Sequence, residues 1–255
     1  MNTLEKIISA AHAGGAVLKN YFGENLVPKI KSVPSDYQTI ADVESEKAVI
    51  AVLEKHFPNY SMLAEESGHI DKHSDWEFII DPLDGTNNFV LGVPFFSVAI
   101  GLHRNRTLEY GVVYNPMINK TYSAQREKGA FANGRKIHVN TVCDIAHISA
   151  GFAGDYLTGH GDGKDAFQKA GIKRFLSFWS PALVLCLVAE GKVEAYGSAG
   201  LAVHDFAGAK LIAKEAGAKI TDFQGNPETD DLSCHFLLSN GTNVHEKLLE
   251  ILTSQ

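Results

Sequence analysis

Two hydrophobic patterns alternate unevenly along the chain. Apolar residues at the spacing of one helix face predict helices, two of them ended by glycine, at residues 3–22, 42–56, 180–190, 205–216 and 244–253. Short apolar or alternating runs predict strands at residues 61–64, 76–80, 95–103, 110–115, 121–125, 146–152 and 193–197, and a hairpin at residues 129–134. Helices and strands mixed in this way predict an α+β or layered α/β fold.

The 255 residues suffice for one large domain or two modest ones. The hydrophobic pattern restarts after Asn140, yet no linker composition or internal repeat marks a boundary there. We therefore expect a single unit over residues 1–255, with an N-terminal α+β part of about 1–140 and a C-terminal α/β part of about 141–255.

Composition and charge narrow the class of function. The chain is 45% hydrophobic and 21% charged, as is ordinary for a globular protein, and its net charge is −7 with no basic tract. This predicts no nucleic-acid binding through phosphates. The longest apolar runs are too short to span a bilayer, so no membrane association is expected. The N-terminus lacks a signal-peptide pattern, and the three cysteines form no CxxC pair, which together favour a cytoplasmic protein without disulfides.

The segment Asp81-Pro-Leu-Asp84-Gly-Thr86 places two carboxylates inside an apolar stretch, where burial is expensive unless they are paired. Pro82 favours extended geometry at Asp81, and Gly85 permits a tight turn into a helix that opens at Thr86. Both carboxylates are thus predicted at a strand end beside a helix N-terminus. Ligand sites of open α/β sheets lie at such places, and helix N-termini bind phosphate.

Three further segments also carry acidic residues at predicted junctions, namely Glu65-Glu66, Asp205 and Asp42. Each alone is typical of a solvated turn or a helix cap. Gathered together, these carboxylates would repel one another and raise each other's pKa unless cations lay among them. Oxygen ligands without histidine or cysteine motifs favour Mg²⁺, with Mn²⁺ possible, over zinc.

These motifs resemble the inositol monophosphatase superfamily, the Mg²⁺-dependent, lithium-sensitive phosphatases. The resemblance runs nearly end to end. It rests on AEESG at residues 64–68, IDPLDGTNNF at 80–89, HDFAGA at 204–209 with EAG at 215–217, and the early series Lys31, Asp36, Thr39 and Asp42. It implies a layered α-β-α-β-α sandwich of the inositol monophosphatase and fructose-1,6-bisphosphatase type.

The resemblance also implies roles for particular residues. Two or three Mg²⁺ ions would be held by Glu65, Asp81, the Leu83 carbonyl, Asp84 and Asp205. The catalytic residues that act on water would be Glu65, Thr86 and Asp42. Phosphate and substrate would contact Gly85, Thr86, Ser198 and Asp205. Glu66 is usually the less direct member of its pair, and the loop 31–42 would complete the site.

The implied activity is Mg²⁺-dependent hydrolysis of a small phosphate ester, such as an inositol monophosphate-like sugar or polyol phosphate, by a metal-activated water. Histidinol phosphate, fructose 1,6-bisphosphate, 3′-phosphoadenosine 5′-phosphate and NADP are alternative substrates among relatives. The family is commonly dimeric, so a homodimer is expected. A non-catalytic regulatory protein on the same fold is the alternative of another class. The haloacid dehalogenase motif D-x-D-G-T is excluded, because Pro82 stands where its nucleophile would be.

Three positions depart from the family pattern and leave the substrate open. His204 stands where the family usually has tryptophan, and Ser198 where inositol-specific members carry glutamate. Trp179-Ser180-Pro181-Ala182 replaces a Gly-Thr/Ser-Ala stretch of the substrate wall, and Trp179 could stack on a ring. The glycine-rich loop 154–165 is a candidate border of the same pocket.

Overall fold

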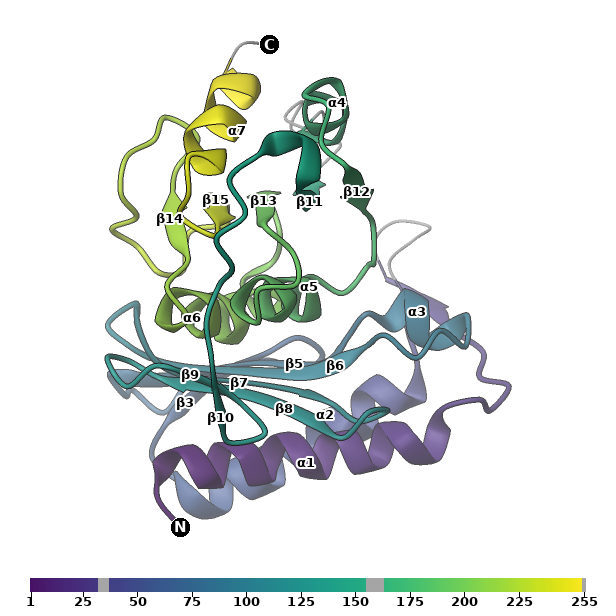
Figure 1. The fold of residues 1–255 in the computed structure, drawn as a ribbon. Helices are drawn as coiled ribbons and strands as arrows, with labels where there is room; N and C mark the ends of the chain where they lie inside the picture. Colours follow the sequence, from purple (N-terminus) through teal and green to yellow (C-terminus); the bar gives the residue numbers. More distant parts are fainter. Residues whose placement is uncertain (32–36, 155–162, 254–255) are drawn as a thin grey trace.

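The protein folds into five layers in the order α-β-α-β-α, as predicted (Figure 1). The computed structural model describes residues 1–31, 37–154 and 163–253. The outer helical layers are α1 (Thr3–Tyr21) with α2 (Ile40–His56), and α4 (Gly163–Lys169) with α7 (Val244–Thr253). The central layer is α5 (Pro181–Ala189) with α6 (Ala207–Glu215).

The first sheet has eight strands in the order β10-β9-β8-β7-β6-β5-β3-β4 and is antiparallel except where β3 pairs with β5. Its strands are β3 (Ser61–Ala64), β4 (Gly68–Ile70), β5 (Trp76–Asp84), β6 (Ser97–Arg104), β7 (Thr107–Asn115), β8 (Lys120–Gln125), β9 (Ala130–Ala132) and β10 (Arg135–Ile137). The short helix α3 (Thr86–Val90) follows β5.

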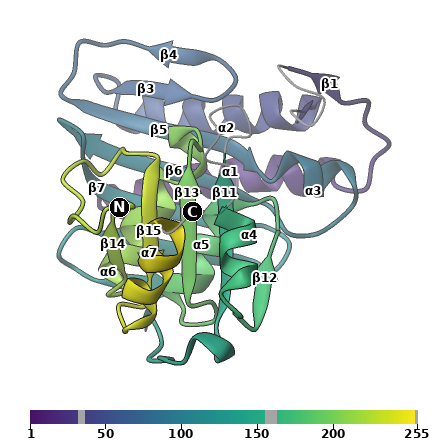
Figure 2. The ribbon, with the colours of Figure 1, turned by 90° about the horizontal axis from the view of Figure 1, so that it is seen from above.

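The second sheet has five strands in the order β12-β11-β13-β15-β14, with β11 parallel to both of its neighbours. Its strands are β11 (Ser149–Gly154), β12 (Arg174–Leu176), β13 (Ala195–Ala199), β14 (Lys219–Thr221) and β15 (His235–Ser239). A separate pair joins β1 (Lys29–Ile30) to β2 (Tyr37–Gln38). Seen from above, the second sheet leaves β3, β4 and α3 uncovered beside it (Figure 2).

The five predicted helices are all present. Strands β1, β2, β4, β12, β14 and β15 were not predicted, because each has two to five residues and too few positions for a pattern. Helix α4 begins at Gly163, inside the expected loop 154–165, most of which lies outside the described residues. The strand expected at 146–152 starts later, at Ser149, because residues 145–147 form a 3₁₀ turn.

The layers enclose separate hydrophobic cores. One core lies between α1, α2 and the first sheet, and another surrounds α5 and α6 between the two sheets. Since α5 has sheets on both sides, it is apolar nearly all round rather than on one stripe. Within the described ranges, no helix is both long and apolar enough to cross a bilayer.

Two glycines let α6 approach the first sheet at backbone distance. A Cβ added at Gly111 on β7 would lie 2.2 Å from the Gly208 carbonyl oxygen, and one at Gly208 would lie 2.5 Å from that of Ile100. The 3₁₀ turn Val203–Asp205 directly precedes α6 and packs against β5 and β6. The close approach therefore sets how near Asp205 comes to the end of β5.

Replacing Gly111 with alanine should destabilise the fold, because the new methyl group would overlap the Gly208 carbonyl. The expected loss is about 1–3 kcal/mol of unfolding free energy, measured by urea denaturation. Thr107→Ala, at an exposed position on the same strand, is the control and should change stability by less than about 0.5 kcal/mol. Equal stabilities of the two variants would contradict the close approach.

Candidate active site

The acidic segment forms the last four residues of β5 and the turn that follows. The pairing with β6 shifts register between Asp81 and Asp84, where Pro82 has no N–H to donate to the ladder. Ser45 Oγ on α2 donates to the Pro82 carbonyl at 2.8 Å. Gly85 has φ of 95°, a left-handed conformation that turns the chain into α3. Asp81 and Asp84 are buried at this junction, as predicted.

Asp84 has one satisfied and one unsatisfied carboxylate oxygen. Ser97 Oγ donates to Oδ2 at 2.9 Å, and Ser180 Oγ donates to the same atom. The buried Oδ1 makes no hydrogen bond within the part of the chain that the structure describes, although the Ala182 and Leu183 amides at the start of α5 are near enough to Asp84 to lower its pKa. Burial raises the pKa of Asp84 to about 7, although both serines lower it. A buried oxygen of this kind is a natural ligand position for a cation.

Asp81 lies among other acidic groups. Burial raises the pKa of Asp81 well above its usual range, and the charges of Glu65, Asp84 and Asp205 raise it further. Its Oδ1 accepts a hydrogen bond from the Leu83 amide at 3.0 Å, which favours the charged form. The four carboxylates predicted as metal ligands are therefore electrostatically coupled.

Asp205 enters the site from the turn before α6. Its side chain keeps 26% of its surface exposed, at the pocket wall. Desolvation, followed by the charges of Asp84 and Glu65, raises the pKa of Asp205 to about 8. His204 lies beside it, with Nε2 at 3.7 Å from Asp205 Oδ1 and 4.0 Å from Glu65 Oε1. An imidazole thus lies between two candidate ligands.

Lys31 supplies a positive charge to the acidic pair. Its Nζ lies 2.8 Å from Glu65 Oε1 and 2.6 Å from Glu66 Oε1. Burial alone would lower the pKa of Lys31, but the hydrogen bonds and charges of both glutamates raise it. Glu46 on α2 fixes the same turn, because its carboxylate accepts from the backbone amides of Glu66 and Ser67.

Asp42 connects α2 to Thr86. Its Oδ2 accepts from the amide and hydroxyl of Thr39 at 2.7 and 2.6 Å, in the capping box of α2. Its Oδ1 accepts from Thr86 Oγ1 at 2.9 Å, and the Leu83 carbonyl lies 3.0 Å from the same hydroxyl. Burial raises the pKa of Asp42 to about 6, against the lowering effect of Thr39 and Thr86.

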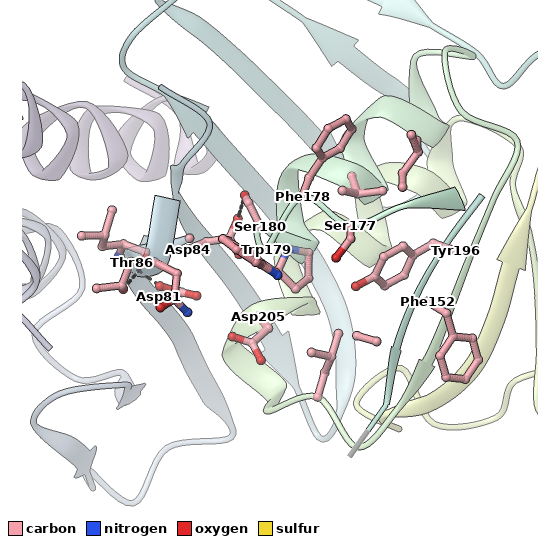
Figure 3. Close-up of a pocket in the computed structure, with 18 of the residues that line it drawn as sticks. Asp81, Asp84, Thr86, Phe152, Ser177, Phe178, Trp179, Ser180, Tyr196 and Asp205 are labelled. Atoms are coloured by element: carbon pink, nitrogen blue, oxygen red, sulfur yellow. Dashed lines mark hydrogen bonds between the residues drawn. The ribbon is translucent and has the colours of Figure 1, made fainter. Parts of the chain in front are cut away.

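A pocket of about 420 Å³ gathers the predicted residues (Figure 3). One side is lined by Glu65, Asp81, Leu83, Asp84, Gly85, Thr86 and Asp205. The other side is mostly apolar and aromatic, with Phe152, Leu176, Phe178, Trp179, Tyr196 and Leu201. Asp42 lies behind Thr86, to which it is hydrogen-bonded.

Within residues 1–31, 37–154 and 163–253, no three acidic, histidine or cysteine side chains converge into a preassembled ligand set. Each carboxylate instead turns to a local donor, such as Lys31, Ser97 or the Ala202 amide. The donor chemistry still fits hard divalent cations, because it combines oxygen ligands, raised carboxyl pKa values and the unpartnered Asp84 Oδ1.

Some functional neighbours differ from expectation. Ser198 does not line the described pocket: its buried hydroxyl donates to the Cys234 carbonyl at 2.7 Å. Ser97 and Ser180, the hydrogen-bond donors to Asp84, were not identified from sequence. Ser97 is the cross-strand partner of Asp84 on β6, a relation that depends on strand register. Asp36 lies outside the described residues.

The five-layer fold with an acidic pocket at the edge of its sheet is typical of one class of protein, and comparison with known proteins identifies that class. The chain belongs to the inositol monophosphatase family, whose model matches residues 2–255. It is 34% identical over 254 residues to an inositol-1-monophosphatase of Mesorhizobium japonicum, covering 94% of this chain and 90% of that protein.

Two further relatives are similar to this chain, one in sequence and one in structure. The chain is 38% identical over 232 residues to Nus factor SuhB of Pasteurella multocida, covering 86% of this chain and 84% of that protein. The solved IMPase of Thermotoga maritima superposes with a TM-score of 0.89 at 31% identity, covering 100% of this chain and 98% of that one. Relatives with enzyme names and relatives named as a Nus factor thus share this fold.

Removing divalent cations should make folding stability fall as pH rises. Asp84 and Asp205 have pKa values of about 7 and 8 in the folded protein, against about 3.9 in unfolded chains. The folded state therefore binds more protons than the unfolded state, and this contribution is lost as pH rises through the folded values. We expect the Tm of EDTA-treated protein to fall between about pH 6.5 and 8, and Mg²⁺ to restore more stability at pH 8.

The window starts near pH 6.5 because buried His245, with a pKa of about 4 in the folded protein, acts in the opposite direction below the ordinary histidine pKa of about 6.5. Asp84→Asn should flatten the fall, since it removes one titrating group. A Tm that rises over this window in EDTA would contradict the site's electrostatics.

Proposed function

We propose that the protein is a phosphomonoesterase that depends on Mg²⁺, with Mn²⁺ as a substitute, and that Glu65, Asp81, the Leu83 carbonyl, Asp84 and Asp205 hold two or three of these ions. The observation that carries the proposal is the buried, unpartnered Oδ1 of Asp84 among coupled carboxylates on one pocket wall. Bound divalent cations would supply positive charge to the phosphate and acidify water.

The chain's own residues would prepare the other half of the reaction. The Thr86 hydroxyl donates to Asp42 Oδ1 at 2.9 Å, so its oxygen lone pairs remain available to accept from a water in the pocket. Glu65, on the same wall, would take the proton of that water. The Gly85 and Thr86 amides at the start of α3 would hold phosphate oxygens.

The finer properties follow the family resemblance. We infer a small phosphate ester as substrate, with no nucleic-acid or membrane partner, and a cytoplasmic location. We also infer a homodimer, and the exposed Leu91 and Val93 after α3, with 64% and 43% of their surfaces accessible, are candidate contacts. Inhibition by Li⁺ is expected from the resemblance alone.

A non-catalytic role is the second candidate, because a relative with 38% identity is named Nus factor SuhB. Phosphate release with and without Mg²⁺ discriminates between the two candidates. Mg²⁺-dependent turnover supports the enzyme, whereas partner binding without turnover on a broad panel of phosphate esters supports a regulatory protein.

Asp84→Asn should lower Mg²⁺-dependent phosphate release by about 100-fold or more, because it weakens the binding of the cation that would stabilise the developing negative charge on the phosphate. Its fold should persist, since the amide is nearly isosteric. Asp81→Asn and Asp205→Asn should also lower the rate, and Asp144→Asn, at an exposed carboxylate that does not line the pocket, is the matched control. Near-normal turnover in all three site variants would refute the metal-ligand assignment.

Thr86→Ala should lower kcat more than it raises KM, because the hydroxyl would orient water rather than bind the ester. We expect a loss of about 100-fold, at the lower end for a positioned proton-transfer group. Thr86→Ser keeps the hydroxyl and should retain most of the rate, with both variants assayed at saturating Mg²⁺. Equal kcat values for Thr86→Ala and the unmodified protein would remove the proposed role.

A further inference from the structure

We propose that the aromatic wall of the pocket selects phosphate esters whose alcohol carries a flat aromatic ring, with Trp179 as its stacking surface. This inference rests on the proposed phosphatase function and names the substrate class. A polyol hydroxyl against the face of the Trp179 indole would lose water without gaining a matched partner there. An aromatic ring would gain both apolar burial and ring contact there.

The position of Trp179 connects the two halves of the pocket. Figure 3 shows Trp179 between the acidic residues Asp81 and Asp84 on one side and Phe178 and Tyr196 on the other. A phosphate held by the acidic half therefore has the indole next to its alcohol group. The aromatic side chains farther along the wall would continue the surface for a larger ring.

The segment that carries Trp179 is fixed directly to the acidic half. Asn88 Nδ2 on α3 donates to the Phe178 carbonyl at 2.5 Å, and Ser180 Oγ donates to Asp84. A Cβ added at Gly85 would lie 3.2 Å from the Trp179 carbonyl oxygen, so the two backbones are in contact. The indole is thus held at a set place relative to the phosphate-binding turn.

Trp179 also adopts a backbone conformation that its side chain does not favour. Its φ is 45°, in the left-handed region, which is uncommon and strained for a bulky residue. Even so, 58% of its surface and 41% of that of Phe178 remain exposed. Trp76, by contrast, stacks on Tyr60 with ring centroids 5.7 Å apart. Strain combined with exposure at a pocket mouth indicates a surface kept for a ligand rather than for the core.

Two matched substrates test this inference. 2-Phenylethyl phosphate and 2-cyclohexylethyl phosphate share the phosphate and the linker, and differ in whether the ring is flat and aromatic. We expect kcat/KM to favour the phenyl ester by about fivefold or more, as ring contacts beyond burial allow. Trp179→Ala should bring the ratio close to one, and Trp179→Phe should keep most of the preference. Leu201→Ala, on the same wall but not aromatic, should also keep it.

Failure of the inference is distinguishable from failure of the phosphatase assignment. In a Trp76→Phe background, Trp179 is the remaining tryptophan of the two. Its emission should shift to the blue when 2-phenylethanol, the uncharged alcohol, is added in EDTA, where the carboxylates would repel a phosphate dianion. The same shift should appear with 2-phenylethyl phosphate in Mg²⁺. If 2-phenylethyl phosphate binds but is not hydrolysed in Mg²⁺, the phosphatase assignment is refuted and the aromatic-ring site is supported.

Three outcomes would overturn the ring site itself. The first is an equal kcat/KM for the phenyl and the cyclohexyl ester in the unmodified protein. The second is better turnover of myo-inositol 1-phosphate than of the phenyl ester. The third is a ratio unaffected by Trp179→Ala while the oligomeric state changes in light scattering, which would make the indole a subunit contact. If the alanine variant fails to fold, Trp179→Gly replaces it, because glycine favours this backbone conformation.

Discussion

The rest of the site depends on the mutual repulsion of buried carboxylates at the end of β5. Asp81 and Asp84 are held there by the strand and by the turn at Gly85, while Asp205 arrives on a turn fixed by the contact of α6 with the sheet. The pKa values of Asp81 and Asp205 rise because burial and neighbouring charge act in the same direction, and burial raises that of Asp84. The repulsion among these carboxylates is relieved when positive charge is near, and protons, Lys31 or divalent cations can supply that charge.

The fold could be predicted where local pattern and length were strong. Amphipathic spacing identified α1 and α2, and the acidic motif correctly located the turn between β5 and α3. The short strands of the second sheet escaped prediction, because three-residue elements such as β12 and β14 exist only through pairing with neighbours. Tertiary hydrogen bonding, not local preference, decides their conformation.

The residues of the site were also predictable only where a local motif marked them. Carboxylates adjacent to recognisable turns, such as Asp84 and Glu65, were predicted and line one pocket. Their supporting donors depend on contacts across the fold: Ser97 meets Asp84 through strand register, and Ser180 through the start of α5. Ser198 differs: its place in the family pattern suggested a substrate contact, whereas in the structure its hydroxyl donates to the Cys234 carbonyl. A motif identifies the kind of residue, whereas register and packing decide what it touches.

The two halves of the pocket obey different constraints, and this separation bears on how one fold supports proteins with different names. The acidic half consists of buried carboxylates. Replacing one of them with a neutral side chain would weaken the attraction of the pocket for cations. The aromatic half includes the segment before α5, where Trp179 and Phe178 are exposed, although the Phe178 ring packs on Phe95 with centroids 4.9 Å apart. We expect a substitution of the exposed Trp179 side chain to change which molecule is bound while the charge arrangement stays intact, because Ser180 still donates to Asp84. On the proposals above, the acidic half would bind the cations and the aromatic half would decide which alcohol is accepted.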